Sequence, residues 1–239
     1  MEKVKAPAVQ FHQENTPESV DGYVKCPTCA GEYTKLCDDG LCLDCSKAAE
    51  KSRRIIATRQ MFIEACLGTR GLREFTFENY KARPENTEAF NACLGFNPTA
   101  HNLYLHGTCG SGKTHLAGAA WRKRVDQVLA CEFLKHPELS RLFRKKEADE
   151  EKILLNKFAA YDVLVIDDIG VGRSMEFANQ ILYEILDARI GNYKNGLIIT
   201  SNLSVEDFAI KVGDDRLPSR IAGMCKVIKI SGRDHRLEP

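Results

Sequence analysis

The sequence predicts an α/β fold, a mostly parallel sheet with helices on both faces, preceded by a small cysteine-rich module. From about residue 75 onward, short apolar strands alternate with helical segments, which is typical of a parallel sheet with helical crossovers. Five of the ten cysteines fall between Cys26 and Cys45, so that segment is organised separately. Residues 1–20 are polar and show no periodicity, and we expect them to form a flexible tail.

The elements follow one another in a regular order. Residues 47–67 lack Pro and Gly and are expected to form a helix that links the two parts. The expected organisation is therefore a cysteine-rich module at 21–46, a helical linker at 47–70 and an α/β domain at 71–239. In this domain the expected strands lie at 102–107, 130–135, 162–170, 196–202 and 226–230, and the expected helices at 113–128, 137–159 and 175–190.

Composition excludes several classes of protein. The chain is 44% hydrophobic and 28% charged, which is ordinary for a globular domain. Its formal net charge of +1 excludes a strongly basic nucleic-acid-binding chain, so any such contact must be local. No apolar run approaches the roughly 20 residues of a membrane helix, and the polar N-terminus has no signal-peptide core. We expect a cytoplasmic protein with no membrane partner and with reduced or metal-bound cysteines.

The segment GTCGSGKT at 107–114 fits a phosphate-binding loop. Its glycines let successive N–H groups converge on phosphate oxygens, and the helix that follows adds its dipole. In such a loop the lysine reaches the β- and γ-phosphates, and the hydroxyl after it completes a magnesium shell. A chance glycine-rich turn would lack the strand before it and the helix after it. We therefore expect ATP and Mg²⁺ to be bound by Gly107, Thr108, Cys109, Gly110, Ser111, Gly112, Lys113 and Thr114.

Polar side chains end two of the expected strands. Asp167 and Asp168 follow the apolar run VLVI, where adjacent acids are costly unless they reach a polar site. With a phosphate-binding loop upstream, Asp167 is expected to hold Mg²⁺ and Asp168 to act as the general base or to orient water. Asn202, at the tip of IITSN, could position the attacking water. The alternatives are a solvated strand end for the acids and a turn for Asn202.

The cysteine cluster contains two Cys-x-x-Cys pairs separated by twelve residues. Four thiolates on two such knuckles form a closed tetrahedral zinc site. The expected ligands are Cys26, Cys29, Cys42 and Cys45. Cys37, between the pairs, could be spare or could replace one ligand, and a redox pair or idle thiols are the alternatives to zinc.

Taken together, these motifs resemble an AAA+ ATPase of the DnaC/IstB type, which has a P-loop NTPase fold. The resemblance covers roughly residues 70–236 and includes FTFENY (75–80), GTCGSGKTHLAGA, VLVIDDIG, IITSN, DDRLPSRIAG (214–223) and a final SGRDHR. It implies that the FENY segment lies near the adenine and that Asn202 acts as sensor 1. It also implies that Arg220 is the finger that reaches a neighbouring subunit's γ-phosphate, with Arg216 a second candidate.

The chain departs from the family pattern in two places. Asp168 stands where many AAA+ proteins carry Glu, and little chain follows Ile230, so the helical lid is expected to be absent or vestigial. The shorter Asp168 side chain reaches less far than Glu, although some loader and IstB-like proteins resemble this Asp-Asp form. The missing lid predicts weak intrinsic hydrolysis, stimulated by DNA or by assembly.

The resemblance implies an ATP-dependent loader of a replicative helicase. Its expected partners are the helicase, met by the zinc module, single-stranded DNA, and further copies of the chain through Arg220. The alternative is an IstB-like transposition helper that acts on duplex DNA, although such proteins usually lack an N-terminal zinc knuckle. A small-molecule kinase would need an arginine-rich lid, and a zinc module alone would leave the ATPase motifs unexplained.

A basic stretch in the expected helix 137–159 is the candidate DNA contact. It contains Arg141, Arg144, Lys145 and Lys146. A solvated helix face balanced by the following EADEE is the alternative.

Overall fold

The computed structural model describes residues 23–33, 35–68, 72–127, 129–171, 175–190 and 195–232. The tail expected at 1–20 lies outside these residues. The chain divides into two compact units, Met1–Gln60 and Met61–Pro239. The division falls inside one helix, α1 (Leu43–Gly68).

The first unit holds a short antiparallel pair, β1 (Val24–Lys25) and β2 (Glu32–Tyr33), followed by the start of α1. The helix expected at 47–67 is present, but it begins earlier than expected, at Leu43. Neither Pro nor Gly separates Leu43 from the later turns, and Asp44 suits the positive end of the helix dipole. The first turn of α1 therefore contains Cys45.

The second unit is built on one five-stranded sheet, and every predicted strand is present. The strands are β3 (Asn102–Gly107), β4 (Cys131–Lys135), β5 (Val163–Ile169), β6 (Gly196–Ser201) and β7 (Cys225–Ile230). Their order is β4-β5-β6-β3-β7, and all four pairings are parallel. The prediction of a parallel sheet is confirmed. Because parallel strands end at the same edge, the polar ends of β3, β5 and β6 meet there.

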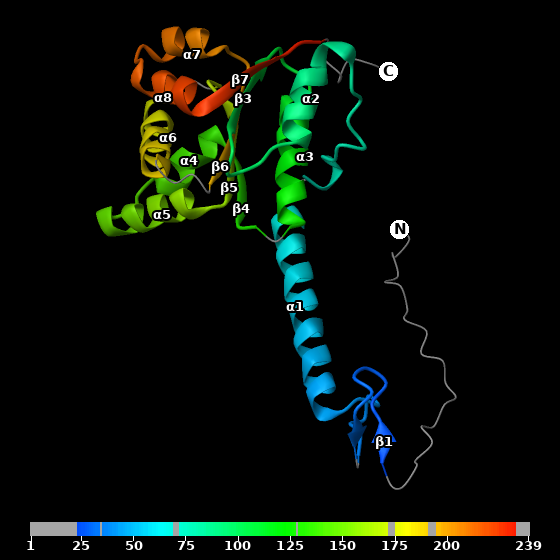
Figure 1. Cartoon of the computed structure of the whole chain (residues 1–239). Helices are drawn as coiled ribbons and strands as arrows, with labels where there is room; N and C mark the ends of the chain where they lie inside the picture. Colours follow the sequence, from blue (N-terminus) through cyan, green and yellow to red (C-terminus); the bar gives the residue numbers. More distant parts are fainter. Residues whose placement is uncertain are drawn as a thin grey trace. The chain divides into compact units, whose positions relative to one another are not determined.

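Helices cover both faces of this sheet (Figure 1). On one side, α2 (Thr87–Leu94) and α3 (Lys113–Val125) pack around Trp121 and Phe96. On the other side lie α4 (His136–Phe143), α5 (Ala148–Ala160), α6 (Glu176–Arg189), α7 (Val205–Val212) and α8 (Arg216–Met224). They pack around Tyr104, Phe208 and the apolar run of β5. Two 3₁₀ turns, Leu72–Glu74 and Pro84–Asn86, precede α2.

The prediction of a single long helix at 137–159 is wrong, because α4 and α5 are separate helices. Lys145 adopts a left-handed backbone, with φ of 63°, between them. The break lets the chain fold back, so that Phe143 and Phe158 are both buried, with ring centroids 6.1 Å apart. The basic stretch is therefore divided between the end of α4 and the turn after it, and it does not form one helical face.

Three short helices, α2, α7 and α8, were not predicted. For α7 the signals are local: Ser204 accepts a hydrogen bond from the backbone N–H of Asp207, and Gly213 ends the helix with φ of 69°. Among the described residues, no helix combines the length and apolar character needed to cross a bilayer.

Candidate functional site

The phosphate-binding loop joins β3 to α3, the context predicted from the sequence. Gly107 ends β3 opposite Ile230 of β7, and Gly112 precedes α3 with φ of 94°. A Cβ on Gly107 would lie 1.9 Å from the carbonyl oxygen of Ile230, and one on Gly112 would lie 2.8 Å from Cε2 of Tyr80. Both positions therefore require glycine.

Lys113 is the first residue of α3 and is only 6% exposed. Its Nζ donates hydrogen bonds to the carbonyl oxygens of Gly107 (2.9 Å) and Thr108 (2.7 Å). The loop thus holds a positive charge beside backbone N–H groups at a helix N-terminus, which together favour an anion.

Asp167 on β5 joins this loop to the sheet. Its Oδ1 accepts hydrogen bonds from Thr114 Oγ1 (2.9 Å) and from Thr200 Oγ1 on β6 (2.6 Å). Burial raises the pKa of Asp167, and the hydrogen bonds from Thr200 and Thr114 partly offset that rise. A hydroxyl and a carboxylate side by side are oxygen donors of the kind Mg²⁺ takes, so these residues fit the ion.

Asp168 turns its side chain toward the same site. Its φ is 64°, and its Oδ1 accepts a hydrogen bond from Asn202 Nδ2 at 3.3 Å. Its backbone N–H donates to Thr200 Oγ1 at 2.9 Å. Thr200 was not predicted, although it stands two residues before Asn202 on the neighbouring strand.

Lys113, Thr114, Asp168 and Asn202 border a cleft of about 450 Å³, whereas Asp167 and Thr200 are not among its lining residues. Its lining residues are Phe75, Asn79, Tyr80, Lys81, Cys109, Gly110, Gly112, Lys113, Thr114, His115, Asp168 and Asn202. The FTFENY segment therefore lies at the same cleft as the phosphate-binding loop. His115 was also missed; its Nε2 lies 2.7 Å from the carbonyl oxygen of Thr76, and its ring contacts those of Phe75 and Tyr80.

Arg220 lies on α8 and lines a separate surface hollow together with Tyr183 of α6. Its guanidinium stacks over the Tyr183 ring at 4.8 Å, donates to the Tyr183 hydroxyl at 2.9 Å and forms an ion pair with Asp187. Arg216 is more exposed and pairs with Asp214. A role for Arg220 at a phosphate would therefore have to involve another copy of the chain.

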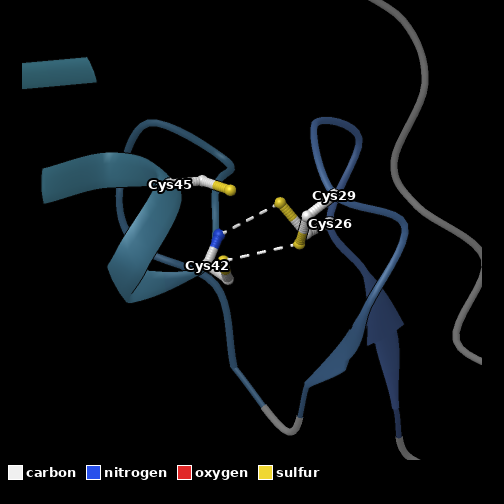
Figure 2. Close-up of side chains that lie close together, drawn as sticks. All are labelled: Cys26, Cys29, Cys42 and Cys45. Carbon is white, nitrogen blue, oxygen red and sulfur yellow. Dashed lines mark hydrogen bonds between the residues drawn. The ribbon is translucent and has the colours of Figure 1, made fainter. Parts of the chain in front are cut away.

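The four cysteines predicted as zinc ligands converge in the first unit. Figure 2 shows their sulfur atoms turned toward one another, and all four lie within 4.8 Å of one another. Tetrahedral zinc with Zn–S bonds near 2.3 Å needs sulfur atoms about 3.8 Å apart. The sulfur atoms of Cys29 and Cys42 are 3.8 Å apart, so the group fits zinc. Cys37 is not a member of it.

Local backbone bonds support this arrangement. The N–H of Cys42 donates a hydrogen bond to Cys26 Sγ at 3.4 Å. This bond is the main reason why the pKa of Cys26 is lowered to about 6. The side-chain hydrogen bond with Cys42 is the main reason why the pKa of Cys45 is raised to about 12.

Of the described side chains in Met1–Gln60, the buried hydrophobic ones are Cys26 and Cys42. A unit with so little apolar burial needs another source of stability, which a structural metal would supply.

Comparison with known proteins agrees with the fold and the loop. The replicative helicase loader DnaC of Escherichia coli K12 is 28% identical over 171 residues, which span 66% of this chain and 68% of DnaC. The replication initiator DnaA of Aliarcobacter butzleri is 27% identical over 190 residues, 75% of this chain but only 39% of DnaA. The DnaI crystal structure superimposes with a TM-score of 0.56 at 25% identity, covering 69% of this chain and 92% of DnaI.

The family of the chain is identified by a family profile that matches most of its residues. The profile of the family described as IstB-like ATP binding protein matches residues 33–239. Members of the IstB/DnaC group are AAA+ ATPases, and the parallel sheet with a phosphate-binding loop is the fold expected of them. The chain belongs to the IstB-like ATP-binding protein family.

Proposed function

We propose that this DnaC-like ATPase loads a replicative DNA helicase. The α/β domain, residues 71–239, would bind ATP, Mg²⁺ and single-stranded DNA. The four-cysteine module, within residues 21–46, would bind zinc and contact the helicase. Similarity to DnaC, by name a replicative helicase loader, supports this assignment.

The cleft residues suit nucleotide chemistry. The phosphates of ATP would lie on residues 107–114, with the Lys113 ammonium at the β- and γ-phosphates. Thr114 and Asp167 would hold Mg²⁺, which when bound neutralises charge on the phosphate oxygens. Asp168 would orient the attacking water or accept its proton, and Asn202 donates a hydrogen bond that holds this carboxylate in the cleft.

The cysteine group is the observation that carries the loader assignment. The family match begins at Tyr33, so Cys26 and Cys29 lie before it. The group is therefore completed by two cysteines outside the matched IstB-like region, whereas Cys42 and Cys45 lie within it. A closed zinc site of this kind serves folding and contacts with partners.

An IstB-like transposition helper is the second candidate, because the matching profile is that of the IstB-like family. In either case Arg220 would act across subunits. Its hydrogen bond to Tyr183 and ion pair with Asp187 would have to open for the guanidinium to reach a phosphate of a second copy.

The helicase contact is tested by capture of the replicative helicase of the same organism on the immobilised full-length protein. Cys45→Ser removes one member of the four-sulfur group, and Cys37→Ser is the matched control because Cys37 lies outside that group. We expect the first variant to lose the helicase but keep ATP binding, and the control to retain both. Equal capture by Cys45→Ser and by the unsubstituted protein would contradict the role of the module.

The DNA substrate is tested by filter binding of matched single- and double-stranded oligonucleotides. The loader assignment predicts that ATP promotes single-strand binding and that affinity falls as salt rises. The basic residues of the 141–146 stretch remain the candidate contacts, although Arg141 pairs with Glu138 and Lys146 with Glu150. A clear preference for duplex, with no helicase captured, would favour the transposition helper.

A further inference from the structure

Strand β5 contains an irregularity at Asp167 and Asp168. In the parallel pairing of β5 with β6, Ile166 lies opposite Ile199, and the next recorded partners are Ile169 and Ser201. Two residues of β5, Asp167 and Asp168, therefore face the single residue Thr200 of β6. One extra residue in one strand is a β-bulge, which interrupts the ladder and re-aims side chains.

The bulge explains how adjacent acids can serve one site. In a regular strand, successive side chains point to opposite faces of the sheet. Here Asp167 bonds to Thr114 of α3, while Asp168 lines the cleft and bonds to Asn202. The left-handed backbone at Asp168, with φ of 64°, makes this possible.

Thr200 occupies the gap that the bulge leaves in the ladder. The backbone N–H of Asp168 donates to Thr200 Oγ1 at 2.9 Å, and the same hydroxyl donates to Asp167 Oδ1 at 2.6 Å. Thr200 is fully buried. Since a hydroxyl has one proton and two lone pairs, both bonds can form at once. One side-chain atom therefore links the expected magnesium carboxylate to the backbone of the expected water-orienting residue.

We infer that Thr200 is a positioning residue for ATP hydrolysis: its hydroxyl fixes the bulge and thereby aims Asp167 and Asp168 together at the nucleotide. The inference rests on the proposed ATPase site. Thr200 acts through the two acids and is not expected to contact nucleotide, because it lies buried behind them and the cleft is lined by other residues.

A merely structural threonine would behave differently. It would satisfy buried polar atoms, so its loss would lower stability and affect nucleotide binding and turnover alike. A positioning residue affects turnover and magnesium dependence more than nucleotide affinity. The two roles therefore separate in a comparison of variants that keep or lose the hydroxyl.

The test compares Thr200→Val, which has nearly the same shape but no hydroxyl, with Thr200→Ser, which keeps it. Loss of a group that supports metal ligands typically costs about 10–100-fold in affinity or activity. We expect Thr200→Val to lower kcat about 10–100-fold and to raise the half-saturating Mg²⁺ concentration, with KM for ATP changed less than about 3-fold. Thr200→Ser should stay within about 3-fold of the unsubstituted protein in all three.

A readout in the nucleotide-free protein tests the geometry independently of activity. The Asp168 amide proton should exchange with solvent faster in Thr200→Val than in Thr200→Ser, as measured by NMR. If Thr200→Val does not fold, Thr200→Ala takes its place in the same comparison. Equal exchange and equal kcat with and without the hydroxyl would overturn the inference. A protein that binds no ATP at all, yet has the exchange difference, would contradict the proposed function and leave the link between Thr200 and Asp168 intact.

Discussion

Gly107→Ala tests the closest backbone approach in the nucleotide site. A Cβ at this position would lie 1.9 Å from the carbonyl oxygen of Ile230 and 3.0 Å from its carbonyl carbon. Gly107 also has φ of 149°, where residues with a Cβ are strained. Because β7 pairs with β3 at this residue, the strand ends must move apart by about an ångström to admit the methyl group.

The expected cost follows from these two effects. Overpacking costs about 1–3 kcal/mol, and a residue held in an unfavourable backbone region costs about 1–2 kcal/mol. The sum is about 2–5 kcal/mol, and each kcal/mol lowers Tm by about 2–4 °C in a domain of this size. Thermal unfolding followed by circular dichroism should therefore show a fall of at least about 4 °C. ATP binding should also weaken, because Gly107 supplies a carbonyl to Lys113.

Gly223→Ala is the matched control. Gly223 lies in α8, no atom lies within 4 Å of a Cβ built on it, and its φ is not in the left-handed region. Alanine is favoured over glycine in a helix by roughly 0.5–1 kcal/mol, so this variant should melt at the same temperature or slightly higher. If Gly107→Ala melts within about 2 °C of the control, the packing of β3 against β7 described above is wrong.

Four further substitutions test separate parts of the site. Lys113→Ala should abolish binding of a fluorescent ATP analogue, and unchanged binding would exclude the loop as the nucleotide site. Cys26→Ser should lose the bound zinc found by metal analysis, whereas Cys37→Ser should keep it. Arg220→Ala should bind ATP normally but hydrolyse it slowly, and mixing it with Lys113→Ala should restore part of the activity if the arginine acts between subunits. Asp167→Asn should abolish magnesium-dependent hydrolysis yet stabilise the nucleotide-free protein at pH 7. Because burial raises the folded-state pKa of Asp167, its destabilising effect is absent below the ordinary value of 3.8, grows as pH rises from 3.8 to the folded pKa, and stays constant above it. The two denaturation curves should therefore converge in acid, and a constant difference across pH would contradict this origin.

The sequence predicts the parts of the molecule that short-range patterns determine. Strands β3, β5 and β6 contain short apolar runs, and the phosphate-binding loop has its glycines at fixed spacing, so these parts could be located without coordinates. The two Cys-x-x-Cys pairs are similarly local. The break after Phe143 could not be predicted, because it depends on the contact of that ring with Phe158, which is a tertiary effect.

The partners of the site residues also depend on contacts between distant segments. Arg220 meets Tyr183 and Asp187 only because α8 packs against α6. Thr200 meets the acids only because β6 lies beside β5 with a bulge in the register. In a regular strand, the side chains of Asp167 and Asp168 would point to opposite faces of the sheet. The sequence does not show the bulge that brings both side chains to one site.

Unfavourable features are concentrated where the nucleotide is expected to bind. A buried carboxylate at Asp167, a left-handed backbone at Asp168 and a strand end at Gly107 that admits no Cβ all lie around one loop. Strained and buried charged groups persist only where neighbouring groups hold them in place, and they are typical of functional sites. Thr200 and Thr114 donate hydrogen bonds to the Asp167 carboxylate, and Asn202 donates one to the Asp168 carboxylate. Thr200 also accepts a hydrogen bond from the backbone N–H of Asp168. If this arrangement served stability alone, an apolar pair in place of the acids would be the better solution for a buried strand. The cost of keeping both acids at the end of β5 is therefore an argument, independent of sequence similarity, that they are retained for chemistry at the nucleotide.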